Sequence, residues 1–339
     1  MKKKFTLSNH QSLLLLSLVL IVAITGSVTL GRYPIGLKEL GGILVSRVMD
    51  VQPFWTKTQE SLLLQHRLPR ILLACLVGGC LSCAGAAYQG VFQNPLASPD
   101  ILGASSGAAF GAALAILLKL PGTWIMLFAF CSSLMTVMLV MFVGSRARGK
   151  RALGLILAGI MVSSLISSGT SLIKLVADPE EQLPAITYWL MGSLNGASPR
   201  DLRLTLLPMA AGLLPLFLLR WRINLLTLGD EEARTMGVNA RQLRTVVILC
   251  ATLVTAAAVS VSGIIGWVGL VIPHLARRMV GSNYRHLLPA ATLFGAVFLL
   301  LVDNLSRNLF STEIPIGILT SFIGAPFFLY LITREGERR

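Results

Sequence analysis

Residues 71–91 read ILLACLVGGCLSCAGAAYQGV, a stretch that contains no Asp, Glu, Lys or Arg. An α-helix needs about 20 mainly apolar residues to cross the ~30 Å hydrocarbon core of a bilayer. Lipid offers the backbone no hydrogen-bond partner, so such a stretch must satisfy its own amide and carbonyl groups by forming a helix. The segment therefore predicts a membrane-spanning helix.

Similar apolar runs recur along the whole chain of 339 residues, and we count ten of them. The run at 204–219 is short for a span, and only a glycine-rich stretch separates 245–262 from 264–280. The chain is thus predicted to be an all-α, polytopic membrane protein with one transmembrane domain over 1–339. The ten runs are 12–30, 71–91, 101–120, 123–143, 152–173, 204–219, 245–262, 264–280, 287–305 and 314–332.

Composition supports this class of protein. Hydrophobic residues make up 54% of the chain and charged residues 13%, against about 25% charged in a typical soluble domain. The net charge of +14 does not indicate nucleic acid, because the basic residues are spread between the apolar runs and no basic face carries stacking aromatics. Membrane proteins retain Lys and Arg on the cytoplasmic side.

An even number of spans places both termini on one side of the membrane. Both ends are basic, with Lys2, Lys3 and Lys4 at one and Arg338 and Arg339 at the other. The positive-inside rule then predicts that both termini are cytoplasmic. On this topology the inside segments are 146–151, 220–244 and 277–286, and the larger outside segments are 31–70, 174–203 and 306–313.

The cysteines do not predict a disulfide framework or a metal site. Cys80 and Cys83 share one helical face, but a closed metal site needs about four ligands. The segment from Gly144 to Arg151 nearly matches a phosphate-binding loop, yet Arg151 stands where Ser or Thr would hold magnesium. We therefore expect no ATP hydrolysis by this chain. The five cysteines, all in apolar runs, are Cys75, Cys80, Cys83, Cys131 and Cys250.

The cytoplasmic segment 220–244 contains a candidate short helix. Gly229 and Asp230 open it, and acidic residues in a first turn suit the helix dipole. Gly237 is typical of a residue that ends a helix, and Asn239 of one that caps a second short helix. Two interpretations stay open: an element that docks on a cytoplasmic partner, or a solvated turn. The apolar side of the element consists of Leu228, Ala233, Met236 and Val238.

Two arginines precede the run at 71–91. Pro69 suits the first position of a helix, so Arg70 is expected in the first turn, where a cation opposes the helix dipole. The topology also places Arg67 and Arg70 outside, against the positive-inside trend. The pair indicates either an acidic partner outside the membrane or cations that snorkel to lipid headgroups.

Two further polar features lie inside apolar runs. Asp303 and Arg307 are four residues apart, which predicts either a functional ionisable pair or a self-neutralising helical pair. The run at 152–173 carries hydroxyls at helical spacing, which could line a wet pathway or hydrogen-bond to a neighbouring helix. These residues are Ser163, Ser164, Ser167, Ser168, Thr170 and Ser171.

Taken together, several short segments resemble the iron-chelate and cobalamin permease family of type II ATP-binding-cassette importers. They follow the order of that family over nearly the whole chain, and the set is specific although each segment alone is weak. The segments are Arg67-Leu-Pro-Arg70, Gly85-Ala-Ala-Tyr-Gln-Gly90, Asn94-Pro-Leu-Ala-Ser-Pro99, Leu102-Gly-Ala-Ser-Ser-Gly107, Trp189-Leu-Met-Gly-Ser193, Leu228–Gly237, Gly266–Arg277, Leu287-Leu-Pro289, Ile314-Pro-Ile-Gly317 and Gly324-Ala-Pro326.

The resemblance implies a multi-pass subunit of a bacterial or archaeal cytoplasmic membrane, surrounded by lipid. It implies a homodimer with the pathway on its axis, two separate ATPase subunits inside and one substrate-binding protein outside. The chain itself would bind no cofactor, because ATP and magnesium belong to the ATPase subunits. Substrate would cross by alternating access.

The resemblance also assigns roles to residues. Arg67, Arg70 and Arg307 would receive acidic residues of the binding protein. Asn94 and Leu96 would form an inner gate, and the loop 144–152 another. The fifth helix would line the pathway with Ser163, Ser164, Ser167, Ser168 and Ser171. The ATPase would be contacted by Leu228, Gly229, Asp230, Glu231, Glu232, Ala233, Arg234, Met236 and Gly237.

An iron complex, either a siderophore or haem, is the expected substrate, with cobalamin or an oxyanion as alternatives within the family. An ion-coupled secondary transporter would need carboxylates or broken helices near the membrane centre, and no acidic residue lies deep inside a run. An intramembrane enzyme would need a convergent site, and His274 is the only histidine well inside a run.

Overall fold

The computed structural model describes residues 8–31, 33, 35–47, 49, 52–146 and 151–336. Each of the ten predicted runs coincides with a helix. Seven helices are long and apolar enough to cross a membrane, two more are apolar but shorter, and α12 has 13 residues. The ten helices are α1 (Asn9–Thr29), α4 (Leu68–Phe92), α5 (Ala104–Leu117), α6 (Gly122–Arg146), α7 (Arg151–Val176), α9 (Pro199–Leu226), α11 (Ala240–Ser262), α12 (Val268–Val280), α13 (Tyr284–Asn308) and α14 (Ile316–Gly336).

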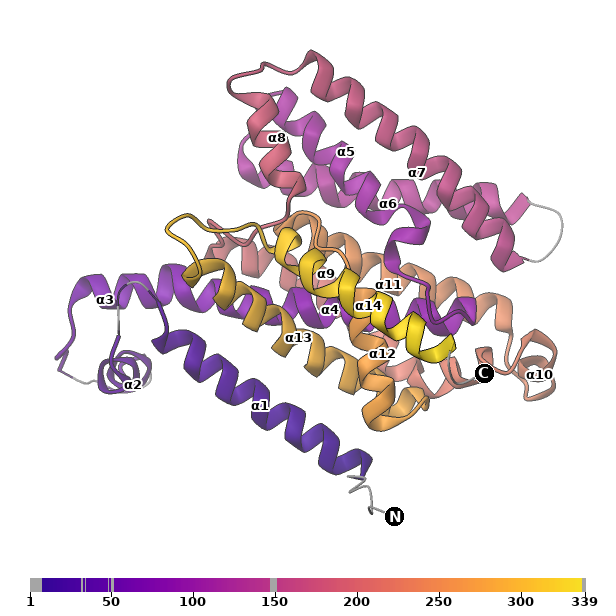
Figure 1. Ribbon diagram of the computed structural model, residues 1–339, viewed down its shortest axis with the longest axis horizontal. Coiled ribbons are helices and arrows are strands. Elements are labelled where there is room, and N and C mark those ends of the chain that lie inside the picture. Colours follow the sequence, from indigo (N-terminus) through magenta and orange to yellow (C-terminus); the bar gives the residue numbers. More distant parts are fainter. Residues whose placement is uncertain are drawn as a thin grey trace.

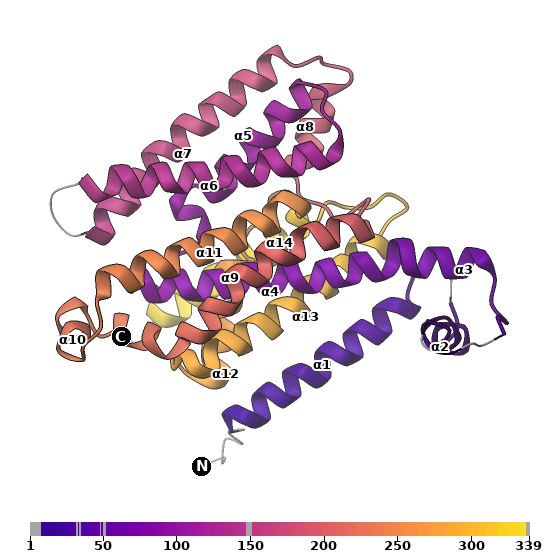
Figure 2. The ribbon, with the colours of Figure 1, turned by 180° about the vertical axis from the view of Figure 1, so that it is seen from behind.

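The long helices form two groups (Figure 1). In one, α4 is packed between α13 and α11, with α1, α9, α12 and α14 around them. In the other, α5, α6 and α7 pack together with the short helix α8 (Gln182–Leu190). The view from behind shows α6 against α11, where the two groups meet (Figure 2). The N-terminal end of α1 and the C-terminal end of α14 point toward the end of the bundle at which α10 (Asp230–Thr235) lies.

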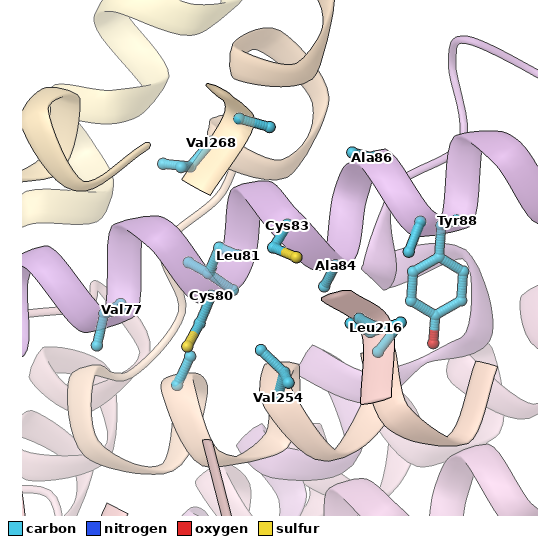
Figure 3. Packing of buried hydrophobic residues seen from close by; sticks show 14 of the residues in the cluster. Val77, Cys80, Leu81, Cys83, Ala84, Ala86, Tyr88, Leu216, Val254 and Val268 are labelled. Carbon is cyan, nitrogen blue, oxygen red and sulfur yellow. The ribbon is translucent and has the colours of Figure 1, made fainter. Parts of the chain in front are cut away.

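Helix α4 is the centre of the core. Cys80, Cys83 and Tyr88 are fully buried against neighbours such as Val254 of α11 and Leu216 of α9 (Figure 3). The approach of α4 to α13 requires small residues, because a Cβ at Gly78 or at Gly295 would collide with the carbonyl oxygen of the other glycine. The cysteine pair is therefore part of the packed core. Among the described residues no group of three or more His, Cys, Asp or Glu could hold a metal ion.

The prediction for the segment 31–70 was incomplete. It contains α2 (Leu37–Val45), α3 (Lys57–Ser61) and the π-helical turn η1 (Leu62–Arg67), which continues without a break into α4. Pro69 therefore lies inside one continuous helix, Lys57–Phe92, and Arg70 is not in its first turn. Proline lacks an amide hydrogen, so one helical hydrogen bond is missing at Pro69, and the π turn lies directly before it. The prediction that Arg70 opposes the helix dipole from the first turn was therefore wrong.

The segment 220–244, which was predicted to be cytoplasmic, contains less loop and more helix than expected. Helix α9 extends to Leu226, with two prolines inside it, and Asn239 caps α11 directly, with its side chain 3.1 Å from the Gln242 amide. There is no separate second short helix. The predicted break near residue 263 is confirmed, since Gly263 and Trp267 both have positive φ and divide α11 from α12.

Candidate functional site

Arg67 is buried at one end of the bundle, with 7% of its surface exposed. Its Nη1 donates a hydrogen bond of 2.9 Å to the Val28 carbonyl near the end of α1, and its Nη2 donates to the Tyr33 carbonyl. A buried guanidinium must have its donors satisfied. Arg67 therefore fastens the end of α1, and the residues that follow it, to the helix that becomes α4.

Arg70 and Arg307 belong to a buried ion network. Arg70 Nε lies 2.9 Å from Asp303 Oδ1, and Arg70 Nη1 lies 3.0 Å from the Glu313 carboxylate. Arg307 Nε lies 3.1 Å from Asp303 Oδ2, which confirms the predicted pair at i and i+4. Arg307 Nη2 also donates to Ser27 of α1 at 2.9 Å. The network joins α1, α4, α13 and the segment before α14.

The network carries an excess of positive charge. Among the described residues, Arg70 and Arg307 pair with Asp303 and Glu313, and Arg67, which bonds to the carbonyls of Val28 and Tyr33, adds a third positive charge near Arg307. Within the described residues, Arg70 Nη2 is buried and has no hydrogen-bond partner. Sequence analysis missed Glu313, because a contact between residues 243 positions apart has no local signal. The cluster can accept a further acidic group, although docking of a partner there remains a prediction.

At the opposite end of the bundle, α10 is a small, tightly fixed element. Asp230 accepts two hydrogen bonds from Arg244 of α11, at 2.7 and 3.1 Å. Ala233 is fully buried, and Gly237, with φ 78°, ends the helix as predicted. Sequence analysis did not identify Arg244, whose burial follows only from the packing of α10 on α11.

The outer surface of this element combines charge with exposed apolar side chains. Leu228 is 54% exposed and Met236 59%, although both are large hydrophobic residues. Glu231, Glu232 and Arg234 are exposed between them. A groove of about 580 Å³ is lined by Met236, Trp221 and Val246, among other residues. A surface of this kind is suited to a protein partner.

The predicted gate residues Asn94 and Leu96 follow the end of α4. Gln93 ends that helix with φ 51°, and the Asn94 side chain accepts a hydrogen bond of 2.9 Å from the Leu96 amide. Gln93 Nε2 donates a bond of 2.6 Å to the carbonyl of Leu226, the last residue of α9. The loop after α4 is thus joined to the helix that leads into α10. Of the other predicted gate, 144–152, residues 147–150 lie outside the described part of the chain.

The serines of α7 do not form one uniform stripe. Ser164, Ser167, Ser168 and Ser171 are exposed, whereas the Ser163 hydroxyl is buried against Gly103. Ser168 and Ser171 each donate a hydrogen bond of 3.0 Å to the carbonyl four residues earlier in α7. These two hydroxyls bond within their own helix instead of to a neighbour, and Leu165 and Leu172 are exposed on the same helix. One side of α7 therefore offers both hydroxyl and apolar groups to its surroundings.

Among the described residues, a bundle with seven helices long and apolar enough to cross a membrane defines a polytopic membrane protein. The chain belongs to the FecCD transport family, which matches it over residues 18–334. It is a multi-pass membrane permease subunit of a bacterial or archaeal ABC importer, and the ATPase lies in a separate subunit.

Relatives cover almost the whole chain. The sequence is 41% identical over 330 residues to the molybdate import system permease protein MolB of Haemophilus influenzae, which covers 95% of this chain and 96% of the relative. It is 39% identical over 335 residues to the hemin transport system permease protein HmuU of Yersinia pestis, covering 96% of each. A solved structure, described as an inward-facing conformation of a metal-chelate type ABC transporter, has a TM-score of 0.85 at 39% identity and covers 95% of this chain and 98% of that one. Substrates therefore differ among close relatives.

Proposed function

We propose that this permease imports an iron complex, either a siderophore or haem, along the axis of a homodimer. A substrate-binding protein docks on the end with Arg67, Arg70 and Arg307, and two ATPase subunits contact α10 at the other. The observation that carries the proposal is the difference between the two ends. One end carries an excess of buried positive charge with an unsatisfied Arg70 donor, and the other exposes Leu228 and Met236 beside acidic residues.

Alternating access requires an element with two states whose balance nucleotide can shift. Helix α10 is a rigid body that could be displaced as a unit, because Arg244 and Ala233 fix it to α11. The bond from Gln93 to Leu226 extends this connection to Asn94 and Leu96, which form the inner gate. The open face of α7, with Ser164, Ser167, Ser168 and Ser171, lines the pathway.

The choice of an iron complex is supported by the hemin relative, which matches nearly the full length of the chain. The exposed side of α7 mixes hydroxyls with Leu165 and Leu172, which suits a bulky substrate that has both polar and apolar surface. An oxyanion is the second candidate, because the molybdate relative is 41% identical. A cobalamin importer would use the same scaffold.

The test is to purify the importer with the binding protein that accompanies it and to identify the bound ligand. We expect elemental analysis to find iron in about one equivalent per binding protein. Molybdenum, or cobalt together with a corrinoid absorption spectrum, would contradict the proposed substrate while leaving the permease assignment unchanged. Uptake into proteoliposomes should require ATP, and uptake driven by an ion gradient alone would contradict the proposed mechanism.

A further inference from the structure

Glu313 differs from the other carboxylate of the arginine network. The Asp303 side chain is completely buried, whereas 26% of the Glu313 side chain is exposed. Asp303 is held inside α13, but Glu313 lies in the non-helical segment between α13 and α14. Of the two carboxylates around Arg70, only that of Glu313 can be reached from outside the protein.

We propose that Glu313 is a placeholder carboxylate, which occupies Arg70 until an acidic side chain of the docking protein takes its position. This inference rests on the proposed docking of a binding protein at the arginine end. A carboxylate exchanged for another carboxylate keeps the number of ion pairs at Arg70 constant. Arg70 remains buried and paired throughout, so the exchange avoids the large cost of leaving a buried charge without a partner.

The position of Glu313 gives the exchange a consequence for the fold. The next residue, Ile314, is held by two hydrogen bonds to Ser306 of α13. The Ser306 hydroxyl donates to the Ile314 carbonyl at 2.6 Å, and the Ile314 amide donates to the Ser306 carbonyl at 3.3 Å. Gly317, at the start of α14, packs against the carbonyl oxygens of Met191 and Ile264. Release of Glu313 would therefore remove one anchor of the segment 309–313 and leave the start of α14 fixed. Increased mobility of residues 309–313 would therefore be a sign that the binding protein has docked.

Substitution of Glu313 by Gln tests the placeholder directly. The variant keeps the shape of the side chain but cannot compete as an anion, so the binding protein should associate about fivefold more tightly, the value of one partly exposed ion pair. The affinity is measured by surface plasmon resonance on the complete importer in nanodiscs at low salt, with the binding protein that co-purifies with it. The matched control is Glu180→Gln, an exposed glutamate in the segment before α8.

A second pair of substitutions separates this inference from the docking proposal. Arg70→Gln combined with Asp303→Asn removes both charges of this buried ion pair, although Arg307 and Glu313 each lose one ion-pair partner. If the binding protein associates with this double variant as with the wild type, docking at Arg70 is wrong, and the placeholder proposal is wrong as well. Loss of binding by the double variant would support docking at Arg70. If the Glu313→Gln variant then shows an affinity that is unchanged, weaker, or raised only as much as that of Glu180→Gln, the placeholder is wrong.

Mobility of the segment gives an independent readout. A nitroxide at Thr312→Cys, in a chain with Cys131→Ser, should become more mobile when the binding protein docks. With Glu313→Gln added, the spectrum should already show the mobile component before docking. A spectrum that does not change in either case would overturn the placeholder.

Discussion

At the residue scale, the molecule keeps several charges away from water and pairs them. Asp303 has no exposed surface, and it is held between Arg70 and Arg307. Buried ion pairs contribute little net stability compared with apolar side chains, but removal of one partner leaves a charge that is costly to bury. Arg70 and Arg307 therefore have a structural role in this chain, in addition to any role in docking.

Replacement of Asp303 by Ala should destabilise the protein strongly. Arg70 and Arg307 would lose their shared carboxylate, and the cost of breaking such a buried pair is about 3–5 kcal/mol. Thermal unfolding in detergent measures the effect. Glu180→Ala is the control, since a substitution at an exposed site usually stays within about 0.5 kcal/mol. A D303A variant that unfolds together with the control would show that the network is not buried as described.

Gln93 should couple the proposed inner gate, Asn94 and Leu96, to α10, the proposed ATPase contact. Gln93→Glu keeps the size of the side chain but places an acceptor next to the Leu226 carbonyl, which removes the bond of 2.6 Å. One hydrogen bond is worth about 1 kcal/mol, so substrate moved per ATP should fall by up to about fivefold. The ratio of uptake to hydrolysis in proteoliposomes measures this, with the exposed outer residue Gln65→Glu as control. An unchanged ratio would show that Gln93 only ends α4.

At the scale of elements, hydropathy located every long helix but not the full length of each. Lipid requires apolar runs to be helical, so all ten runs were found. Helix α9 and the helix Lys57–Phe92 extend beyond the apolar runs into polar sequence, where hydropathy carries no signal. Contacts within one turn, such as Asp303 with Arg307, were predictable from spacing. The pairing of Arg70 with Glu313, and of Arg244 with Asp230, depended on tertiary packing.

The clamp between Arg244 and Asp230 should hold α10 against α11. Because the Asp230 side chain is 58% exposed, the pair should contribute only about 0.5–1 kcal/mol. Asp230→Ala and Arg244→Ala should each increase hydrogen–deuterium exchange over residues 229–237. The double variant should exchange no faster than the more affected single variant. Additive increases would mean that the two residues act independently.

The crossing of α4 and α13 should not tolerate a single added methyl group. A Cβ at Gly78 would overlap the Gly295 carbonyl, and overpacking of this kind costs about 1–3 kcal/mol. Gly26→Ala in α1 is a matched control, because a Cβ there meets nothing within 4 Å. Thermal unfolding should show Gly78→Ala clearly below the wild type and Gly26→Ala equal to it or above. Equal stability of the two variants would contradict the close approach.

At the scale of the whole molecule, function depends on two ends that differ in chemistry. The arginine network joins α4 to the last part of α13, and α10 lies at the far end of the same bundle (Figure 1). The helices between them carry the core, with α4 buried over most of its length. In the proposed function each end receives its own soluble partner, and the buried core connects the two ends.

The sidedness of the two ends tests this arrangement most directly. In a chain with Cys131→Ser, a single cysteine is introduced at Glu231 of α10 or at Thr312. Each variant is treated with a membrane-impermeant thiol reagent in right-side-out and in inverted membrane vesicles. We predict that Glu231→Cys is labelled only in inverted vesicles and Thr312→Cys only in right-side-out ones. Labelling of Glu231→Cys in right-side-out vesicles would contradict the proposed contact of α10 with the ATPase subunits.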